Sequence, residues 1–278
     1  MPRRRSDHAV LAWWGALGLG LGLLVLALVI GLQKARLAWE ANPLWSHAHQ
    51  VAPLIAQLRQ GHAPSPDMVK QAEGTVLANL LQTLVDADRQ RRQALLAYQT
   101  QVEAVALGSW LTPAKLVNVQ GRAQVKLRLD ELRAALDELV RRDAAVQSRL
   151  DEALLAWLQQ WPGLQEWPWR RDLLASTGST AQATAAFCRV EQDLVTRVEA
   201  LLGQLNHVGR GVTLEGSAAT QELVFARQDD LAFYRATLSD LNDLGHREQQ
   251  GLVAAEQASG QHARELGDLL AAALEQAR

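Results

Sequence analysis

The chain has 278 residues, with 28 basic and 30 acidic side chains, a formal net charge of −2 and a single cysteine. One cysteine excludes an intrachain disulfide framework and a CxxC metal knuckle, and the balanced charge argues against a nucleic-acid-binding domain. Eight prolines and 19 glycines are too few for a disordered or collagen-like chain, so we expect one or two folded domains and no nucleic-acid partner.

Residues 9–32 form an uncharged, largely apolar segment after a short basic tail at residues 1–8. A membrane-spanning helix needs about 20 apolar residues at a rise of about 1.5 Å each, so this segment is long enough to span a bilayer. A cleavable signal peptide would have a shorter apolar region and a small-residue cleavage site, whereas Gln33-Lys34-Ala35-Arg36 follows here. We therefore predict an uncleaved transmembrane helix at residues 9–32.

Positive charges flank this predicted helix unequally. Arg3, Arg4, Arg5 and the amino terminus precede it, and Lys34 and Arg36 follow it. Because positive charge favours the cytoplasmic side, residues 1–8 are expected to be a cytoplasmic tail. The excess of Arg over Lys is typical of a GC-rich bacterial genome. The expected location is thus the bacterial inner membrane, single-pass, with the bulk of the chain in the periplasm.

Three glycines lie on one face of the predicted anchor, at positions Gly15, Gly18 and Gly22. Gly18 and Gly22 form a GxxxG pair, and small residues allow two spanning helices to approach closely. This face therefore indicates helix dimerisation in the lipid bilayer. The alternative is that glycine is simply frequent in membrane helices.

Residues 33–65 are expected to form a linker that contains one short helix. The segment is broken at Asn42-Pro43 and contains Pro53, and a turn-rich stretch covers residues 61–66. Because proline disfavours a helix interior, we expect this helix to be kinked at Pro53 or to begin again there.

From residue 66 to residue 278 the pattern predicts an extracytoplasmic helical bundle. Apolar residues recur at steps of three and four, and no segment shows the alternation typical of a strand. Four long helices are predicted, at about residues 66–107, 113–160, 179–206 and 218–274. Thr112 followed by Pro113 is a strong start signal for the second helix.

The predicted fold is accordingly all-α, an elongated antiparallel bundle or coiled coil. Short connections make consecutive helices antiparallel neighbours. The start of the first long helix, the connection between the second and third, and the C-terminus should then lie at one end. The fourth helix is the longest, so its tail is expected to overhang or to pack on the segment at residues 44–60.

The connection between the second and third helices is rich in Trp and Arg, with Trp161, Trp167, Trp169, Arg170 and Arg171. If the first long helix starts near the bilayer, this loop also faces the membrane. Trp favours the headgroup zone and Arg favours anionic headgroups, so we expect the loop to contact the membrane surface or an integral partner. The alternative is that its tryptophans cap the bundle end as ordinary core residues.

Charged residues interrupt the apolar stripes, Arg91 in the first long helix and Asp143, Glu191 and Arg227 in the following three. The last three are the candidates for one polar layer. Counting outward from the connections at about 1.5 Å per residue places the three side chains in one layer. One interpretation is an interhelical ion pair that sets the register. The other is a ligand pocket in which Arg227 binds an anionic group and the two carboxylates bind a cationic group. His262, on the fourth stripe, is expected to be a hydrogen-bonded core residue.

Motifs for enzymatic chemistry are scarce. Residues 211–217 have the two-glycine spacing of a phosphate loop, but they lack its lysine and follow no predicted strand. Cys188 is expected to be a small buried residue, with a reactive thiolate or an intermolecular disulfide as alternatives. The histidines at 47, 49 and 62 lack the further ligands of a tetrahedral metal site. We therefore predict no catalytic residue, no cofactor and no metal.

These features favour a non-enzymatic scaffold or accessory subunit that binds protein partners, or a second copy, through its helices. The alternative is a ligand-sensing bundle that signals through a separate membrane partner and binds a small molecule. The combination of anchor and bundle is similar to the all-helical input domains of bacterial transmembrane receptors, although no family motif is present. An enzyme of unrecognised type is the third hypothesis.

Overall fold

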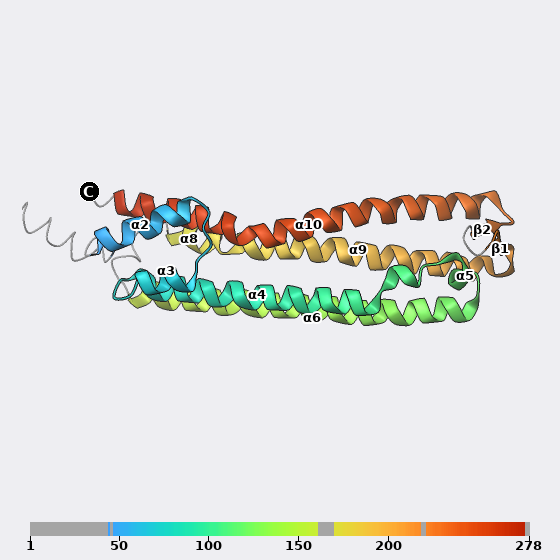
Figure 1. Cartoon of the computed structure of the whole chain (residues 1–278), viewed down its shortest axis with the longest axis horizontal. Helices are drawn as coiled ribbons and strands as arrows, with labels where there is room; N and C mark the ends of the chain where they lie inside the picture. The colour runs from blue at the N-terminus through green and yellow to red at the C-terminus, as the bar shows by residue number, and fades with distance from the viewer. Residues whose placement is uncertain (1–43, 45–46, 161–169, 218–220, 276–278) are drawn as a thin grey trace, which may run out of the picture.

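The computed structural model describes residue 44 and residues 47–160, 170–217 and 221–275 (Figure 1). Nearly all of this part of the chain is helical, which confirms the predicted all-α class in this coarse sense. The four long helices run antiparallel along one rod, and their bounds are α4 (Leu77–Val105), α6 (Val119–Gln160), α9 (Gly178–Val208) and α10 (Gln228–Glu275).

Shorter elements connect these helices or cover their ends. Two short helices precede the bundle, α2 (Ala48–Arg59) and α3 (Pro66–Gln71). Between α4 and α6 lie the 3-10 turn η1 (Leu107–Ser109) and α5 (Pro113–Leu116). The remaining elements are α8 (Arg170–Ser176), the 3-10 turn η2 (Gly209–Gly211) and the strands β1 (Val212–Glu215) and β2 (Glu222–Phe225).

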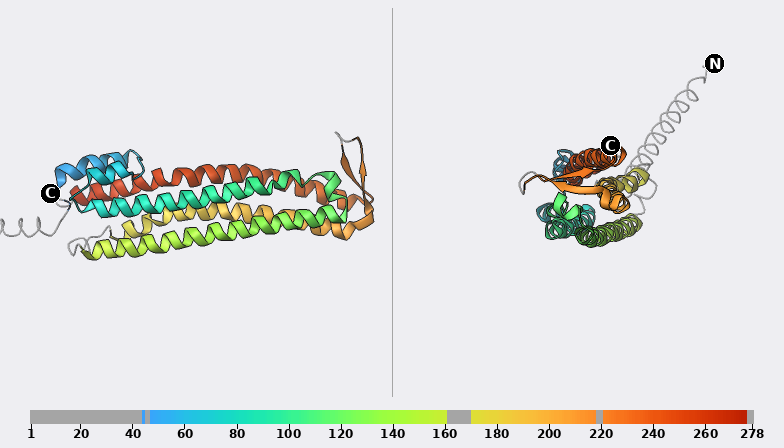
Figure 2. Two further views of the ribbon diagram at one scale, coloured as in Figure 1. Left: turned by 60° about the horizontal axis from the view of Figure 1, so that its bottom comes forward. Right: turned by 90° about the vertical axis from the view of Figure 1, so that its right-hand side faces the viewer.

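The helix ends are distributed between the two ends of the rod as predicted. The helices α2, α3 and α8, the last residues of α6 and the last residues of α10 lie at one end, here called the proximal end (Figure 1). The strands β1 and β2 lie at the opposite, distal end, as both views in Figure 2 show. The chain traverses two long helices to reach the end of α6 and four to reach the end of α10, and an even number of antiparallel helices returns it to the starting end.

We predicted no strand beyond residue 66, and this prediction is wrong, because two strands lie at the distal end. The strands β1 and β2 form an antiparallel hairpin in which Val212 pairs with Phe225 and Glu215 with Glu222. The burial of Val212 and Leu223 alternates with exposed neighbours, which is strand periodicity. The predicted fourth helix, from about residue 218, had included the residues of β2, whereas α10 begins at Gln228.

Two predicted helices are each divided by a turn. The first is interrupted between α3 and α4, where Gly74 has a φ of 79° and the Thr75 hydroxyl accepts the Leu77 N–H at 3.2 Å. The second is interrupted after α5, where Asn118 Oδ1 accepts the N–H of Gly121 at 2.5 Å. A Cβ on Gly121 would lie 2.0 Å from the Lys115 carbonyl oxygen, so glycine is required at this turn.

The segment before the bundle packs against the tail of α10, as expected. Helix α2 runs through Pro53 without restarting, because the lost hydrogen bond falls in its first turns, where the His49 carbonyl is near water. A Cβ on Gly267 of α10 would lie 2.6 Å from the Arg59 nitrogen, so the two helices touch backbone to backbone. Arg59 Nε also donates to Asp268 Oδ1 at 2.9 Å.

The predicted transmembrane helix at residues 9–32, including Gly15, Gly18 and Gly22, lies outside the described residues. Within the described residues, no helix combines the length and the apolar character needed to cross a membrane. The predictions of an anchor, of its orientation and of a glycine dimer face therefore stay predictions.

Candidate functional site: a polar waist and its pocket

The buried apolar residues form two separate clusters. The proximal cluster joins α2, α4, α6, α8 and α10 and includes Leu58, Leu84 and Leu266. The distal cluster joins α4, α6 and α9 with the hairpin and includes Tyr98 and Phe187. Between them lie polar side chains from all four long helices, here called the polar waist: Arg91, Asp143, Thr180, Thr184, Ser259 and His262.

An ion pair between α4 and α6 lies at the centre of the polar waist. Arg91 Nε donates to Asp143 Oδ1 at 3.0 Å, and about nine-tenths of both side chains is buried. A second guanidinium nitrogen of Arg91 donates to Gln147 Oε1 at 2.5 Å. Burial raises the pKa of Asp143, and the Arg91 charge opposes that rise. Both side chains occupy stripe positions, so each helix contributes one charge to an otherwise apolar interface.

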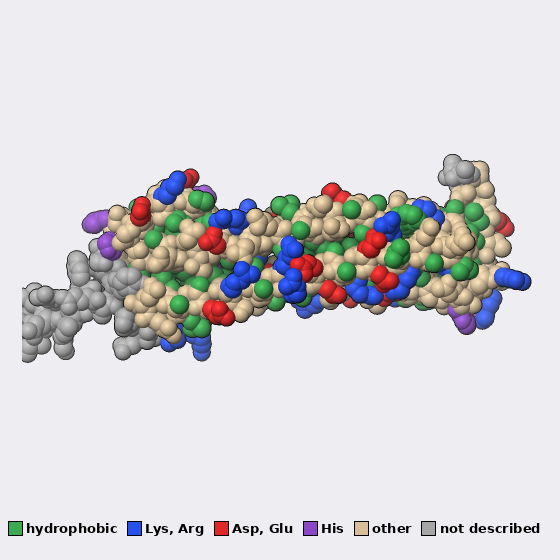
Figure 3. Space-filling model, turned by 90° about the horizontal axis from the view of Figure 1, so that it is seen from below, with side chains coloured by type: hydrophobic (Ala, Val, Ile, Leu, Met, Phe, Trp, Pro, Cys, Tyr) green, Lys and Arg blue, Asp and Glu red, His purple; other side chains and the backbone are tan. Residues whose placement is uncertain are grey.

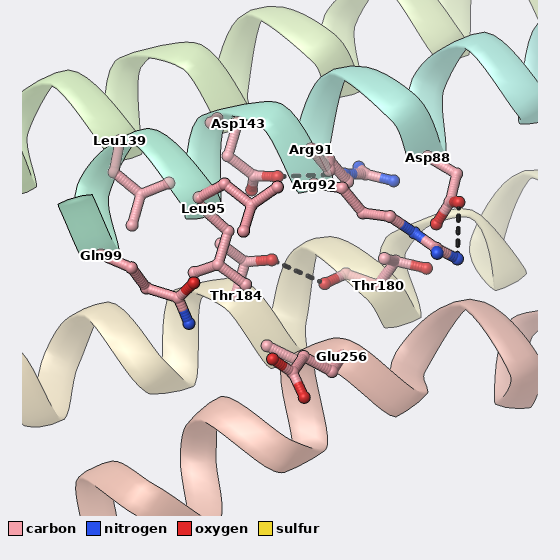
Figure 4. A pocket seen from close by; sticks show the side chains of 13 residues that line it. Asp88, Arg91, Arg92, Leu95, Gln99, Leu139, Asp143, Thr180, Thr184 and Glu256 are labelled. Atoms are coloured by element: carbon pink, nitrogen blue, oxygen red, sulfur yellow. Dashed lines mark hydrogen bonds and ion pairs between the residues drawn. The ribbon is translucent and has the colours of Figure 1, made fainter.

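A pocket of about 330 Å³ opens beside the polar waist and is lined by residues of α4, α6, α9 and α10 (Figure 4). Ala94, Leu95 and Leu139 supply apolar walls, and Thr180 and Thr184 supply hydroxyls. The remaining polar or charged lining residues are Asp88, Arg91, Arg92, Gln99, Asp143 and Glu256. The pocket thus combines an apolar surface with a small number of polar groups, which is typical of small-molecule sites.

The pocket belongs to a longer feature, here called the open seam, between α4 and α10 on the distal side of the polar waist. Helix α4 packs on α6, α6 on α9 and α9 on α10, whereas α4 and α10 are not a closely packed pair. Leu95 and Leu252 are only half-buried along this line, and Leu96 is 60% exposed. Three sides of the four-helix array are therefore closed and the fourth is not.

A second buried polar group lies in the distal cluster. Glu191 on α9 is 3% exposed and lies near Tyr98 on α4 and Glu248 on α10. Within the described residues, Oε1 of Glu191 and the hydroxyl of Tyr98 have no hydrogen-bond partner. Burial raises the pKa of Glu191 to about 7, and the Glu248 carboxyl acts in the same direction. Burial therefore favours the protonated form of this carboxyl to a higher pH than in an exposed glutamate.

The structure buries two of the three residues predicted to form one polar layer, Asp143 and Glu191. It places the third, Arg227, at the surface. Asp143 and Glu191 are both buried, but Asp143 pairs with Arg91 rather than with Arg227. The Arg227 side chain is 72% exposed and lies 3.7 Å from Asp229, just before α10. The predicted alignment was wrong because the hairpin moves the start of α10 by about ten residues. Arg91 occupied a seam position in the sequence, which was the signal for its role.

Trp161, Trp167 and Trp169 of the Trp-rich connection lie outside the described residues. Arg170 is half-buried at the start of α8, and Arg171 is exposed with its Nε 3.9 Å from Asp172 Oδ1. The expected contact of this loop with a membrane or a partner stays a prediction. Trp157, the neighbouring tryptophan of α6, is buried, and its indole N–H donates to the Val76 carbonyl at 2.8 Å.

Cys188 and His262 occupy the structural roles expected of them. Cys188 is buried and its thiol is free, and burial raises the pKa of this thiol to about 12. His262 Nδ1 lies 2.8 Å from the Ser176 carbonyl oxygen, and burial lowers the pKa of the imidazole. In the described part of the chain, no group of three or more His, Cys, Asp or Glu side chains is arranged to hold a metal ion.

Ion pairs recur along the surface of the rod. On the face formed by α4 and α6, acidic and basic side chains lie next to one another without a large patch of one sign (Figure 3). Lys126 and Arg133 on α6 both pair with Glu199 on α9, at 2.8 and 2.6 Å. By contrast, Glu248 and Glu256 beside the open seam have no ion-pair partner within the described residues.

The polar waist, its pocket and the open seam together offer apolar surface, hydroxyls and uncompensated carboxylates, which are groups for binding. Comparison with known proteins adds no functional assignment to this geometry. No family model matches the chain, and neither a curated protein nor a solved structure is significantly similar to it.

Proposed function

We propose that this protein is a non-enzymatic scaffold or accessory subunit, anchored in the bacterial inner membrane, that binds a partner protein through helix–helix contacts. In this proposal the segment at residues 9–32 spans the bilayer, the N-terminus is cytoplasmic and the bundle extends into the periplasm. The observation that carries the proposal is the open seam between α4 and α10.

The protein itself provides an example of what covers such a seam. At the proximal end, α2 packs on α10 and joins the side chains of α4 in one buried cluster. On the distal side of the polar waist, no described helix lies over α4 and α10 in the same way. Apolar side chains there, such as Leu95 and Leu96, are left partly in water. A further amphipathic helix would bury them, as in other helix-in-groove complexes.

The charges beside the open seam indicate which partner helix fits it. Glu248 and Glu256 lie on α10 beside the open seam, and neither has a basic partner within the described residues. Arg91 and Arg92 on α4 are already paired with Asp143 and Asp88. A partner helix with an apolar stripe flanked by Lys or Arg would therefore match the seam in both shape and charge.

Site-specific photocrosslinking in membranes tests this proposal. A photoreactive residue at position 96, on α4 beside the seam, should crosslink to one discrete partner protein. The matched control is position 127 on α6, since Leu127 is 58% exposed against 60% for Leu96 and lines none of the pockets described here. Equal crosslinking at both positions, or a product made only of two copies of this chain, would contradict the proposal.

The anchor and its orientation need a separate experiment. A reporter that is active only in the periplasm, fused after residue 278, should be active in the full chain. A second reporter that is fluorescent only in the cytoplasm should stay dark at the same position. The reverse result would overturn the proposed location without affecting the seam.

A second candidate function is ligand sensing, in which the bundle binds a small molecule and signals through a separate membrane partner. The specific observation in its favour is the pocket of about 330 Å³ at the polar waist, lined by residues of all four long helices. A ligand there would contact elements that join the proximal and distal clusters, so binding would change how the two halves are coupled.

A further inference from the structure

We propose that the pocket beside the polar waist binds an amphipathic monocation, namely an organic ammonium carried on a short apolar body. This inference rests on the second candidate function, ligand sensing, and names the class of ligand for it. It is argued from the size of the pocket, its walls and the charges that line it.

The pocket has the size and walls of a small-molecule site. Its volume of about 330 Å³ lies in the range of about 300–1,000 Å³ that such sites occupy. The apolar wall is made by Ala94 and Leu95 of α4, Leu139 of α6 and Ala255 of α10. Because these residues come from three helices, they can enclose a compact apolar group such as an aromatic ring.

The lining charges leave one negative charge uncompensated. Three lining residues are acidic (Asp88, Asp143 and Glu256) and two are basic (Arg91 and Arg92). Arg91 is paired with Asp143 at 3.0 Å, and Arg92 with Asp88 at 2.9 Å. Glu256 has no ion-pair partner within the described residues, so a monocation would neutralise the pocket and an anion would be repelled by this carboxylate.

The same pocket also has hydrogen-bond acceptors. Figure 4 labels Glu256 on α10, Thr180 and Thr184 on α9, and Gln99 on α4 among the residues that line the same pocket. The Thr184 hydroxyl donates its hydrogen to the Thr180 carbonyl oxygen at 3.3 Å, which leaves its oxygen lone pairs as acceptors. An ammonium group has only donors, so it can use these oxygens without leaving an unpaired group of its own.

Other acidic side chains along the open seam also favour a cation. Glu248 lies two turns before Glu256 on α10, and Glu191 faces it from α9. An anionic ligand would have to displace Asp88 or Asp143 from their arginines, and Arg91 is held additionally by Gln147. The geometry therefore favours a cation over an anion.

Three probes with the same apolar body test the proposal: 3-phenylpropylammonium, 3-phenylpropanol and 3-phenylpropionate. Binding to the full chain in detergent micelles is measured by calorimetry and by the shift in Tm, since a ligand of the folded state stabilises it with occupancy. We expect saturable binding of the ammonium, about tenfold or more tighter than the alcohol, and no binding of the carboxylate.

Matched variants locate the site. Glu256→Gln should weaken binding of the ammonium about fivefold or more and leave binding of the alcohol unchanged. The control Glu103→Gln removes the same charge from an exposed position of α4 outside the pocket, and it should leave binding of both probes unchanged. Ala255→Met fills the pocket and should abolish binding of both probes. The control Ala254→Met places the same side chain on the exposed neighbouring residue and should leave binding of both probes unchanged. An unchanged Tm without probe shows that each variant folds.

Three results among the binding measurements would overturn the inference, and a fourth is the absence of any binding. The three are equal affinity for the ammonium and the alcohol, tighter binding of the carboxylate, and unchanged ammonium affinity in Glu256→Gln. Absence of binding by all three probes would also overturn it. The crosslinking experiment at position 96 uses no probe, so a scaffold that binds a partner helix remains distinguishable from failure of the ligand pocket.

Discussion

The proximal and distal halves of the rod use the same four helices but differ in what covers the line between α4 and α10. In the proximal half α2 lies on α10 so closely that Gly267 has no room for a Cβ, and Leu54 and Leu58 are fully buried. In the distal half Leu95 and Leu252 are half-buried along the same line. A seam between two long helices is completed by a fifth helix where the chain supplies one, and stays open elsewhere.

The polar waist separates these halves. A buried pair such as Arg91 and Asp143 adds little net stability, because desolvation of both charges offsets their attraction. Its effect is to specify which residues face each other, as polar residues do in coiled-coil interfaces. The two apolar clusters are thereby held in one register although they are not continuous.

The largest expected effect comes from breaking the ion pair of the polar waist. Arg91→Leu leaves Asp143 buried without its counter-charge and should lower the free energy of unfolding by about 3–5 kcal/mol. The double variant Arg91→Leu, Asp143→Leu should recover most of that loss. Urea denaturation measures both, with Arg89→Leu as the control, since Arg89 is also paired with an aspartate but is largely exposed. A loss no larger than that of the control would show that the waist pair does not hold the halves together.

The next prediction compares the covered and open parts of the seam directly. Leu58→Ala removes a fully buried side chain of α2 and should lower the free energy of unfolding by about 2–4 kcal/mol. Leu252→Ala, at the half-buried open seam, should cost about 1 kcal/mol or less. Thermal and urea unfolding of the two variants gives the ratio of their losses in free energy of unfolding. Equal losses would mean that the seam is as well packed in the distal half as in the proximal half.

A third prediction concerns pH and the distal cluster. The pKa of Glu191 is raised from its ordinary value of 4.5 to about 7, so the folded state keeps a proton that the unfolded state releases. Its contribution to stability is present in full below pH 4.5 and is lost as the pH rises through about 7. Glu191→Gln should flatten this dependence and stabilise the protein at pH 8 by at most about 3 kcal/mol. Parallel pH profiles of the parent and the variant would contradict the assignment.

The smallest effect is expected at the surface. Arg197 on α9 lies 3.0 Å from Asp240 on α10, but both side chains are almost half exposed. Asp240→Asn should change the free energy of unfolding by about 0.5 kcal/mol or less, because water and salt screen such pairs. A larger loss that disappears in high salt would show that charge, rather than apolar packing, holds α9 to α10.

Residue spacing alone determined much of the architecture. The apolar steps of three and four predicted that each long helix buries one face, and the number of helix reversals predicted which connections share an end. These features depend only on local periodicity and chain direction, so no tertiary information was needed. The hairpin left only a weak trace in the sequence, because Val212-Thr213-Leu214-Glu215 alternates whereas Leu223-Val224-Phe225 is a continuous apolar run. Each strand is only four residues long, and a pattern so short also fits a helix.

Tertiary structure decided which neighbours those faces meet. The stripe placed Arg91, Asp143 and Glu191 at the interfaces, but a periodic pattern carries no information on which helix lies opposite. That depends on the length of each turn, and the extra hairpin residues moved Arg227 out of the layer and left Arg91 as the partner of Asp143. The cover of α2 over α10 and the open seam beside the pocket likewise depend on how far helices of unequal length overlap, which only the packed bundle specifies.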